Sequence, residues 1–280
     1  MRVTLWGTRG SLPSAGPDTI RYGGNTSCVE VRSADGTLLV LDAGSGIRRL
    51  GTKVEPEIAR LDLLLTHLHT DHIQGLGFFR PLYQPDLEVH VWGPPSTIHD
   101  LRTRVARYLS PPFFPAHVRD LPCRLTFHDV PRGSFDVGGL QIKSDLVCHP
   151  SPTVGYRITE DDVSIAYLSD HEPALGVRQF PGDPEWTSGF ELASGVNLLI
   201  HDAQYSDAEY LERVGFGHSS VRQAVAFAAA TSVERLVTFH HDPAHDDLTL
   251  DRLAEEAREA SDLPFELVSG TEDASFELGG

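Results

Sequence analysis

The sequence holds only three cysteines, one methionine and no long run of apolar residues. The cysteines (Cys28, Cys123 and Cys148) are odd in number, far apart and without a CxxC pair. This spacing excludes a disulfide framework and favours a reduced, cytoplasmic protein. A helical membrane span needs about 20 consecutive apolar residues, so we expect no membrane partner. The N-terminus also lacks the apolar stretch of a signal peptide.

Positive charge is also scarce. The sequence has 23 Lys and Arg residues but 40 Asp and Glu residues, which gives a net charge of −17. Such a field opposes non-specific binding to a polyanion. We therefore expect a small-molecule substrate rather than a long nucleic acid. Bound divalent cations would offset part of the negative charge near a site.

Short apolar runs rich in Val, Leu and Ile predict strands, and apolar spacing near 3.6 predicts helices between them. Runs of strands with interleaved helices, twice over, indicate an α/β protein whose two αβ halves pack sheet to sheet in one domain, 1–280. The expected strands are 2–7, 27–33, 37–44, 61–66, 89–95, 140–149, 153–159, 163–170, 197–205 and 236–240, and the expected helices are 96–109 (with a Ser or Thr cap), 219–231 and 250–260.

Three histidines and one aspartate crowd into THLHTDHIQG, which directly follows the apolar run 61–66. Alternate side chains of an extended strand end lie on one side, so His67 and His69 can hold one ion together. Asp71 and His72 follow where a helix is expected to begin, and a carboxylate suits the positive end of a helix dipole. They could hold a second ion. The alternative is a polar turn that is rich in histidine by chance.

Further ligands for two ions are expected at other strand ends. His149, Asp170 and His240 each close an apolar run, and the Asp170 carboxylate could bridge two ions. His241 follows His240 directly, so either histidine could be the last ligand. An all-nitrogen and oxygen ligand set permits Zn²⁺ or Mn²⁺, and also Fe.

These motifs resemble the metallo-β-lactamase fold superfamily, and within it the ribonuclease Z and cyclic-phosphodiesterase branch. The resemblance rests on HxHxDH at 67–72, GTRGSLPS at 7–14, LDAGSG at 41–46, LSD at 168–170 and GHSS at 217–220. It implies a four-layer αβ/βα sandwich with the site at one sheet edge. It also implies that one ion is held by His67, His69 and His149, a second by Asp71, His72 and His240, and that Asp170 bridges them.

The resemblance adds a pair for proton transfer. Asp202 and His218 match an acidic residue and a GHS-type histidine that serve this role in the ribonuclease Z branch. A histidine paired with a carboxylate can protonate a leaving oxygen near neutral pH. Asp71 could orient the nucleophile. In the alternative interpretation, Asp202 only caps a turn and His218 only starts a helix.

The substrate is the most open question. Ribonuclease Z enzymes that process tRNA carry a long Gly/Pro-rich arm, whereas the matching stretch 110–124 is short and not basic. We therefore expect a phosphodiesterase for a small cyclic phosphodiester, such as 3′,5′-cyclic AMP. Phe113 or Phe114 could stack on its base, or the loop is packed by its own aromatics. The alternatives are a ribonuclease Z-like RNA hydrolase, a lactone or thioester hydrolase, and a non-catalytic binding protein. The resemblance also makes a homodimer possible.

Overall fold

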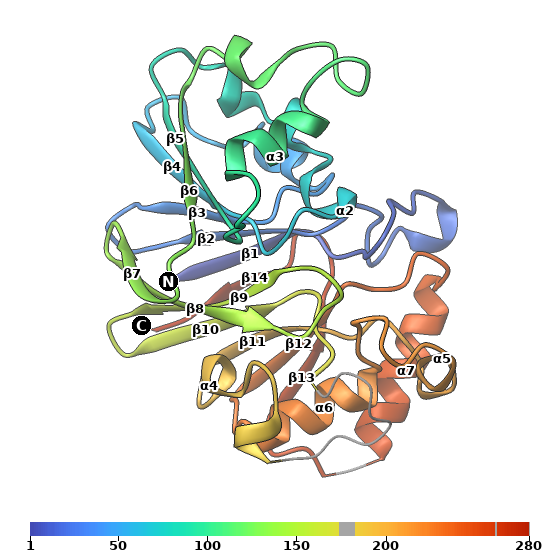
Figure 1. Ribbon diagram of the computed structural model, residues 1–280. Helices are drawn as coiled ribbons and strands as arrows, with labels where there is room; N and C mark the ends of the chain where they lie inside the picture. Colours follow the sequence, from blue (N-terminus) through green and yellow to red (C-terminus); the bar gives the residue numbers. More distant parts are fainter. Residues whose placement is uncertain (174–182, 261, 280) are drawn as a thin grey trace.

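The computed structural model describes residues 1–173, 183–260 and 262–279. Two seven-stranded sheets lie face to face, and helices cover the outer face of each (Figure 1). The protein is therefore an α/β sandwich of four layers, as the sequence predicts.

The first sheet has the order β14-β1-β2-β3-β4-β5-β6. β1 to β3 form an antiparallel meander, and β3 to β6 run parallel to one another. Its strands are β1 (Arg2–Gly7), β2 (Cys28–Arg32), β3 (Leu38–Leu41), β4 (Arg60–Leu64), β5 (Glu88–Gly93), β6 (Arg124–Asp129) and β14 (Ser275–Glu277). Beyond it lie α1 (Ile47–Leu50), α2 (Thr70–Ile73) and α3 (Leu101–Tyr108), toward the top of Figure 1.

The second sheet has the order β13-β12-β11-β10-β9-β8-β7 and is parallel from β10 to β13. Its strands are β7 (Gly133–Val137), β8 (Leu140–Val147), β9 (Thr153–Glu160), β10 (Val163–Leu168), β11 (Leu198–Asp202), β12 (Arg235–Phe239) and β13 (Glu266–Ser269). The helices on its side are α4 (Phe190–Ala193), α5 (Asp207–Glu212), α6 (Val221–Ala230) and α7 (Asp247–Glu259), toward the bottom of Figure 1.

The hydrophobic core has three layers, one between the sheets and one under each set of helices. The central layer joins apolar side chains of both sheets, such as Leu41 of β3 and Ile165 of β10. Two buried tyrosines of the second sheet also reach the first. Tyr156 donates a hydrogen bond to the Leu65 carbonyl at 2.7 Å, and Tyr167 donates one to Asp42 at 2.9 Å. These contacts fix the two sheets relative to each other next to the motif loop.

Every strand expected from the sequence is present, but three details differ. α3 begins at Leu101, because the Asp100 side chain accepts the Thr103 amide at 2.7 Å and caps the helix in place of Ser96 or Thr97. The C-terminal strand β14 pairs with β1 in the first sheet, so the two sheets are not simply the two halves of the chain. β6, β7 and β13 were not expected, because their side chains alternate between half-buried and exposed or their runs are short.

No helix in the described residues is both long enough and apolar enough to cross a membrane.

Candidate metal centre

The expected site residues come together where strands of both sheets end. His67 and His69 lie in the loop after β4, and Asp71 and His72 lie in the single turn of α2, which begins at Thr70. His149 and Asp170 each follow a strand of the second sheet by two residues, and His240 directly follows β12. Parallel strands end at the same sheet edge, which is why residues far apart in sequence converge here.

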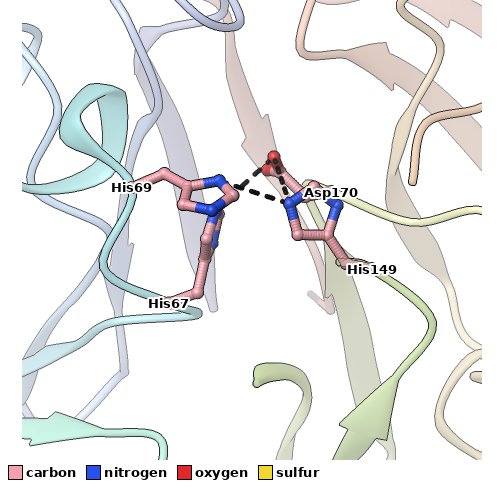
Figure 2. Close-up of side chains that lie close together, drawn as sticks. All are labelled: His67, His69, His149 and Asp170. Carbon is pink, nitrogen blue, oxygen red and sulfur yellow. Dashed lines mark hydrogen bonds and ion pairs between the residues drawn. The ribbon is translucent and has the colours of Figure 1, made fainter. Parts of the chain in front are cut away.

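One group consists of His67, His69, His149 and Asp170, whose ligand atoms all lie within 4.8 Å of one another. Figure 2 shows the two histidines of the motif loop facing His149 and Asp170. His149 Nε2 lies 3.3 Å from His69 Nδ1, and Asp170 Oδ2 lies 3.7 Å from His67 Nε2. His69 is exposed whereas the other three are buried, so this group opens to solvent through His69.

A second group consists of Asp71, His72, Asp170 and His240, all of them buried. Asp71 Oδ2 lies 3.1 Å from His240 Nε2 and 3.2 Å from His72 Nε2. Asp170 Oδ1 lies 3.0 Å from His72 Nε2, and Asp170 Oδ2 lies 3.4 Å from His240 Nε2. Asp170 therefore belongs to both groups: Oδ1 faces His72, whereas Oδ2 lies near His240 and also near the histidines of the first group.

The two groups differ in how they bind protons. Burial lowers the pKa values of His67, His69 and His149, which keeps these imidazoles neutral. Burial also acts against a charged His240, but Asp170 and Asp71 outweigh it and raise the pKa of His240 to about 9. Without an ion, a proton on His240 therefore offsets part of the charge of the neighbouring carboxylates.

These residues fit divalent cations. His67 Nε2 is buried without a hydrogen-bond partner among the described residues. His72 Nε2 and Asp170 Oδ1 face each other but are too poorly aligned to form a hydrogen bond. Buried polar atoms are normally satisfied, so orphan atoms converging on one point indicate a missing partner. Imidazole nitrogens and carboxylate oxygens are common ligands of Zn²⁺ and Mn²⁺.

The far ring nitrogens of these histidines have partners that hold them in place. Asp42 contacts His72 Nδ1 at 2.8 Å, Thr66 contacts His67 Nδ1 at 3.0 Å, and the Gly217 carbonyl accepts from His149 Nδ1 at 2.9 Å. Such outer contacts fix the tautomer and aim of a metal-binding histidine. The sequence pattern assigns no role to Asp42, although this residue lies within the LDAGSG stretch at 41–46. Its φ of +59° is strained for a non-glycine residue.

The structure separates His240 from His241. His240 points into the second group, and its backbone has the uncommon φ of +60°. His241 points away and contacts the Gly270 carbonyl through Nε2 at 2.9 Å. Gly10 packs so closely on the His240 ring that a Cβ there would lie 2.4 Å from Nδ1, so only glycine fits.

Asp202 and His218 form a close pair beside the second group. His218 Nδ1 lies 2.7 Å from Asp202 Oδ2, and the His218 ring stacks on His240 with centroids 5.0 Å apart. The other Asp202 oxygen accepts the Ser219 amide at 3.0 Å. Asp202, His218 and His240 could also hold an ion together. The short Asp202–His218 contact instead favours a hydrogen-bonded pair.

Comparison with known proteins agrees with this arrangement. Residues 37–241, well over half of the chain, match the family model described as a beta-lactamase superfamily domain. The chain belongs to the metallo-β-lactamase superfamily. Within this superfamily, a ribonuclease Z from Mycobacterium avium (strain 104) is 29% identical over 273 residues, which cover 87% of each protein.

Solved structures of this superfamily have the same fold. The metallo-β-lactamase fold protein YhfI from Bacillus subtilis superposes with a TM-score of 0.70 at 19% identity, covering 98% of both chains. A diphosphatase of the PhnP family gives a TM-score of 0.70 at 20% identity, covering 99% of this chain and 98% of the other. The chain is thus a metal-dependent hydrolase of the metallo-β-lactamase superfamily, and it is similar to a ribonuclease Z over most of its length.

Proposed function

We propose that this hydrolase is a phosphodiesterase that holds two divalent ions and cleaves a small phosphodiester, with 3′,5′-cyclic AMP as the first candidate. The observation that carries the proposal is the pair of residue groups that share Asp170, with the Asp202–His218 pair beside them. Two close metal sites next to a proton donor suit in-line displacement at phosphorus.

In this proposal, one ion would be held by His67, His69 and His149, the other by Asp71, His72 and His240, and Asp170 would serve as a ligand in both groups. The ions, Zn²⁺ or Mn²⁺, would supply Lewis acidity, lowering the pKa of a water molecule and neutralising charge on the phosphoryl oxygens. Asp71, which accepts a hydrogen bond from the Ser11 amide at 2.8 Å, would accept another from the attacking water and so orient it. His218 gives a proton to the departing alkoxide. Asp202 fixes His218 through Nδ1, which leaves Nε2 to donate.

A small substrate is favoured by the loop after α3. Residues 109–121 contain a short 3₁₀ turn, Val118–Asp120, and no extended arm. Phe114 is buried, and its ring centroid lies 5.7 Å from that of Phe78 in an edge-to-face contact, so it packs the loop and is not free to stack on a base. Phe113 remains 77% exposed. The net charge of −17 also opposes binding of a long polyanion.

An RNA substrate is the second candidate, and a specific observation favours it. The relative described above is named ribonuclease Z and matches over 87% of both proteins. This finding is at odds with our expectation that a long nucleic acid is not bound. The same metal groups and the same proton donor would serve cleavage of an RNA phosphodiester.

The test is turnover of cyclic AMP and, in parallel, of a precursor tRNA by Mn²⁺- or Zn²⁺-loaded protein. Asp170→Asn should lower kcat/KM by more than about a hundredfold, because it removes a ligand common to both ions. The matched control is Asp62→Asn, since Asp62 is also buried but contacts Arg60 and Trp92 away from the site. Cleavage of the tRNA alone would favour the RNA candidate. No cleavage of either, with metal shown to be bound, would contradict the phosphodiesterase proposal.

A further inference from the structure

Glu172 is a buried glutamate that no step of the proposed mechanism uses. It lies two residues after Asp170, its exposed fraction is 0%, and its own amide donates to the Cys148 carbonyl at 3.1 Å, beside His149. A buried carboxylate is costly unless its oxygens accept several hydrogen bonds. The hydrogen-bond donors around the Glu172 carboxylate therefore indicate which part of the structure it stabilises.

Among the described residues, the hydrogen-bond donors to the Glu172 carboxylate come from one segment, α5 and the loop before α6. Tyr210 donates its hydroxyl to Oε1 at 2.7 Å. The Gly215 amide lies 3.0 Å from Oε1 and 3.1 Å from Oε2, and the Gly217 amide donates to Oε2 at 2.9 Å. The carboxylate thus gathers a phenol and two backbone amides that are two residues apart.

The loop can wrap a carboxylate only because of its glycines. Gly215 and Gly217 have φ values of +88° and +89°, in the left-handed region that other residues rarely adopt. Backbone amides that converge in this way form an anion-binding concavity. A Cβ on Gly217 would also lie 2.4 Å from His149 Nδ1, so this turn packs directly against a residue of the first candidate metal-binding group.

The same loop supplies two groups to the site. The Gly217 carbonyl accepts from His149 Nδ1 at 2.9 Å, and the next residue is His218, the proton donor of the proposed mechanism. We propose that Glu172 is a positioning residue. Its carboxylate clamps residues 215–217 so that His218 faces the leaving group. This inference rests on the proposed function for the role of His218.

The transfer of a proton from His218 makes the role of Glu172 measurable, because leaving groups differ in whether they need that proton. The bond from phosphorus to the alkoxide oxygen breaks, its electron pair stays on that oxygen, and the oxygen takes the proton from His218. A nitrophenolate leaving group departs without a proton. A misplaced His218 should therefore lower the rate of hydrolysis of alkyl esters but not that of nitrophenyl esters. Damage to the metal-binding residues should lower both rates.

The experiment compares Glu172→Gln with wild type on cyclic AMP and on bis(p-nitrophenyl) phosphate, with bound metal quantified. We expect kcat on cyclic AMP to fall about a hundredfold, within the usual contribution of general acid catalysis, and kcat on the nitrophenyl ester to change less than about fivefold. His218→Ala should show the same contrast. Equal losses of kcat on both esters, with the bound metal unchanged, would overturn the positioning role.

A second readout does not depend on turnover. In ¹⁵N-glycine-labelled protein, the Gly215 and Gly217 amides should exchange with solvent at least about tenfold faster in Glu172→Gln than in wild type, because they lose a charged acceptor. Unchanged exchange rates of these two amides would contradict the proposal that Glu172 holds the loop. Should the wild type cleave neither ester, the proposed function fails, while the exchange rates still decide whether Glu172 holds the loop.

Two further variants serve as a control and as a substitute for Glu172→Gln. Glu30→Gln is the matched control, since Glu30 is 5% exposed and accepts from Trp6 and Arg32 in the first sheet. This substitution should change neither the ratio of kcat values on the two esters nor the exchange rates of the Gly215 and Gly217 amides. If Glu172→Gln does not fold, Tyr210→Phe removes one clamp hydrogen bond and should give the same contrast at a few-fold size. Equal loss on both esters in Tyr210→Phe would contradict the proposal.

Discussion

His240 and His241 are chemically identical neighbours with different surroundings. Burial lowers the pKa of His241 to about 3, and its Nε2 contacts a backbone carbonyl, so it remains neutral and structural. His240 meets two carboxylates of the candidate metal centre. The difference arises from the left-handed backbone at His240, which turns its ring toward the sheet edge.

Substitution of each histidine tests this difference. His240→Gln should remove at least one bound metal ion, because a ligand of the second group is lost. His241→Gln should keep the metal content and lower only stability, by about 1–3 kcal/mol for a lost buried hydrogen bond. Metal analysis by mass spectrometry and chemical denaturation measure both. Loss of metal in His241→Gln alone would reverse the assignment.

Asp42 acts behind the ligands rather than among them. Its carboxylate contacts His72 Nδ1 at 2.8 Å and also accepts from Thr66 and Tyr167. Asp42→Asn should weaken metal affinity by about 10–100-fold, as expected when an outer partner of a ligating histidine is removed. Competitive chelator titration measures this. Tyr167→Phe removes one hydrogen bond to Asp42 but leaves the carboxylate, so its effect should be smaller.

At the scale of elements, α5 shows how a helix start supports the site. Ser206 and Glu209 form a capping box at its N-terminus, with the Ser206 amide 2.8 Å from Glu209 Oε2. Glu209 also meets His245 at 3.0 Å. Burial acts to raise the pKa of Glu209, but these hydrogen bonds outweigh it and lower the pKa to about 2. α5 leads directly into the loop that carries His218.

This shift sets the sign of a pH effect. Because the folded-state pKa of Glu209 lies below its ordinary value of 4.5, its contribution to stability is present above that value and is lost as pH falls toward about 2. Wild type should therefore exceed Glu209→Gln in free energy of unfolding at neutral pH, and the gap should shrink near pH 3. Denaturant titrations at several pH values measure the gap. Glu212→Gln, an exposed glutamate of the same helix, should show no such trend.

At the scale of the whole molecule, the candidate centre joins the two sheets. The motif loop and α2 belong to the side of the first sheet, whereas His149, Asp170 and His240 follow strands of the second. Ions held between them would bind only the folded state. They would therefore stabilise it in proportion to their concentration over their Kd.

Removal of metal should thus lower the melting temperature. Ions present at about 100 times their Kd add about 2.7 kcal/mol, which corresponds to a shift on the order of 5 °C for a chain of 280 residues. Thermal denaturation with and without a chelator, followed by addition of Zn²⁺ or Mn²⁺, measures the shift. An unchanged melting temperature in protein shown to have lost its metal would contradict the placement of ions between the sheets.

The sequence was sufficient for the central strands and for the neighbourhood of the motif. The strands β4, β10 and β12 are rich in apolar residues because nearly all of their positions, on both faces, are buried, which makes them easy to recognise. The polar residue after each run then predicts where the site lies. β6 and α3 were harder, since half-exposed alternation and competing cap residues leave the local pattern ambiguous.

The sequence by itself determined the positions of the strands around the motif, the candidate ligands and the family, because HxHxDH and the strand-end residues are local patterns. Only the tertiary structure decided that His240 rather than His241 faces the centre, that Asp42 supports His72, that β14 joins the first sheet, and that Glu172 holds the loop of His218. These four depend on backbone angles and on partners between 30 and 275 residues away, or on a glycine turn that wraps a distant carboxylate. Local propensity carries no information about such contacts.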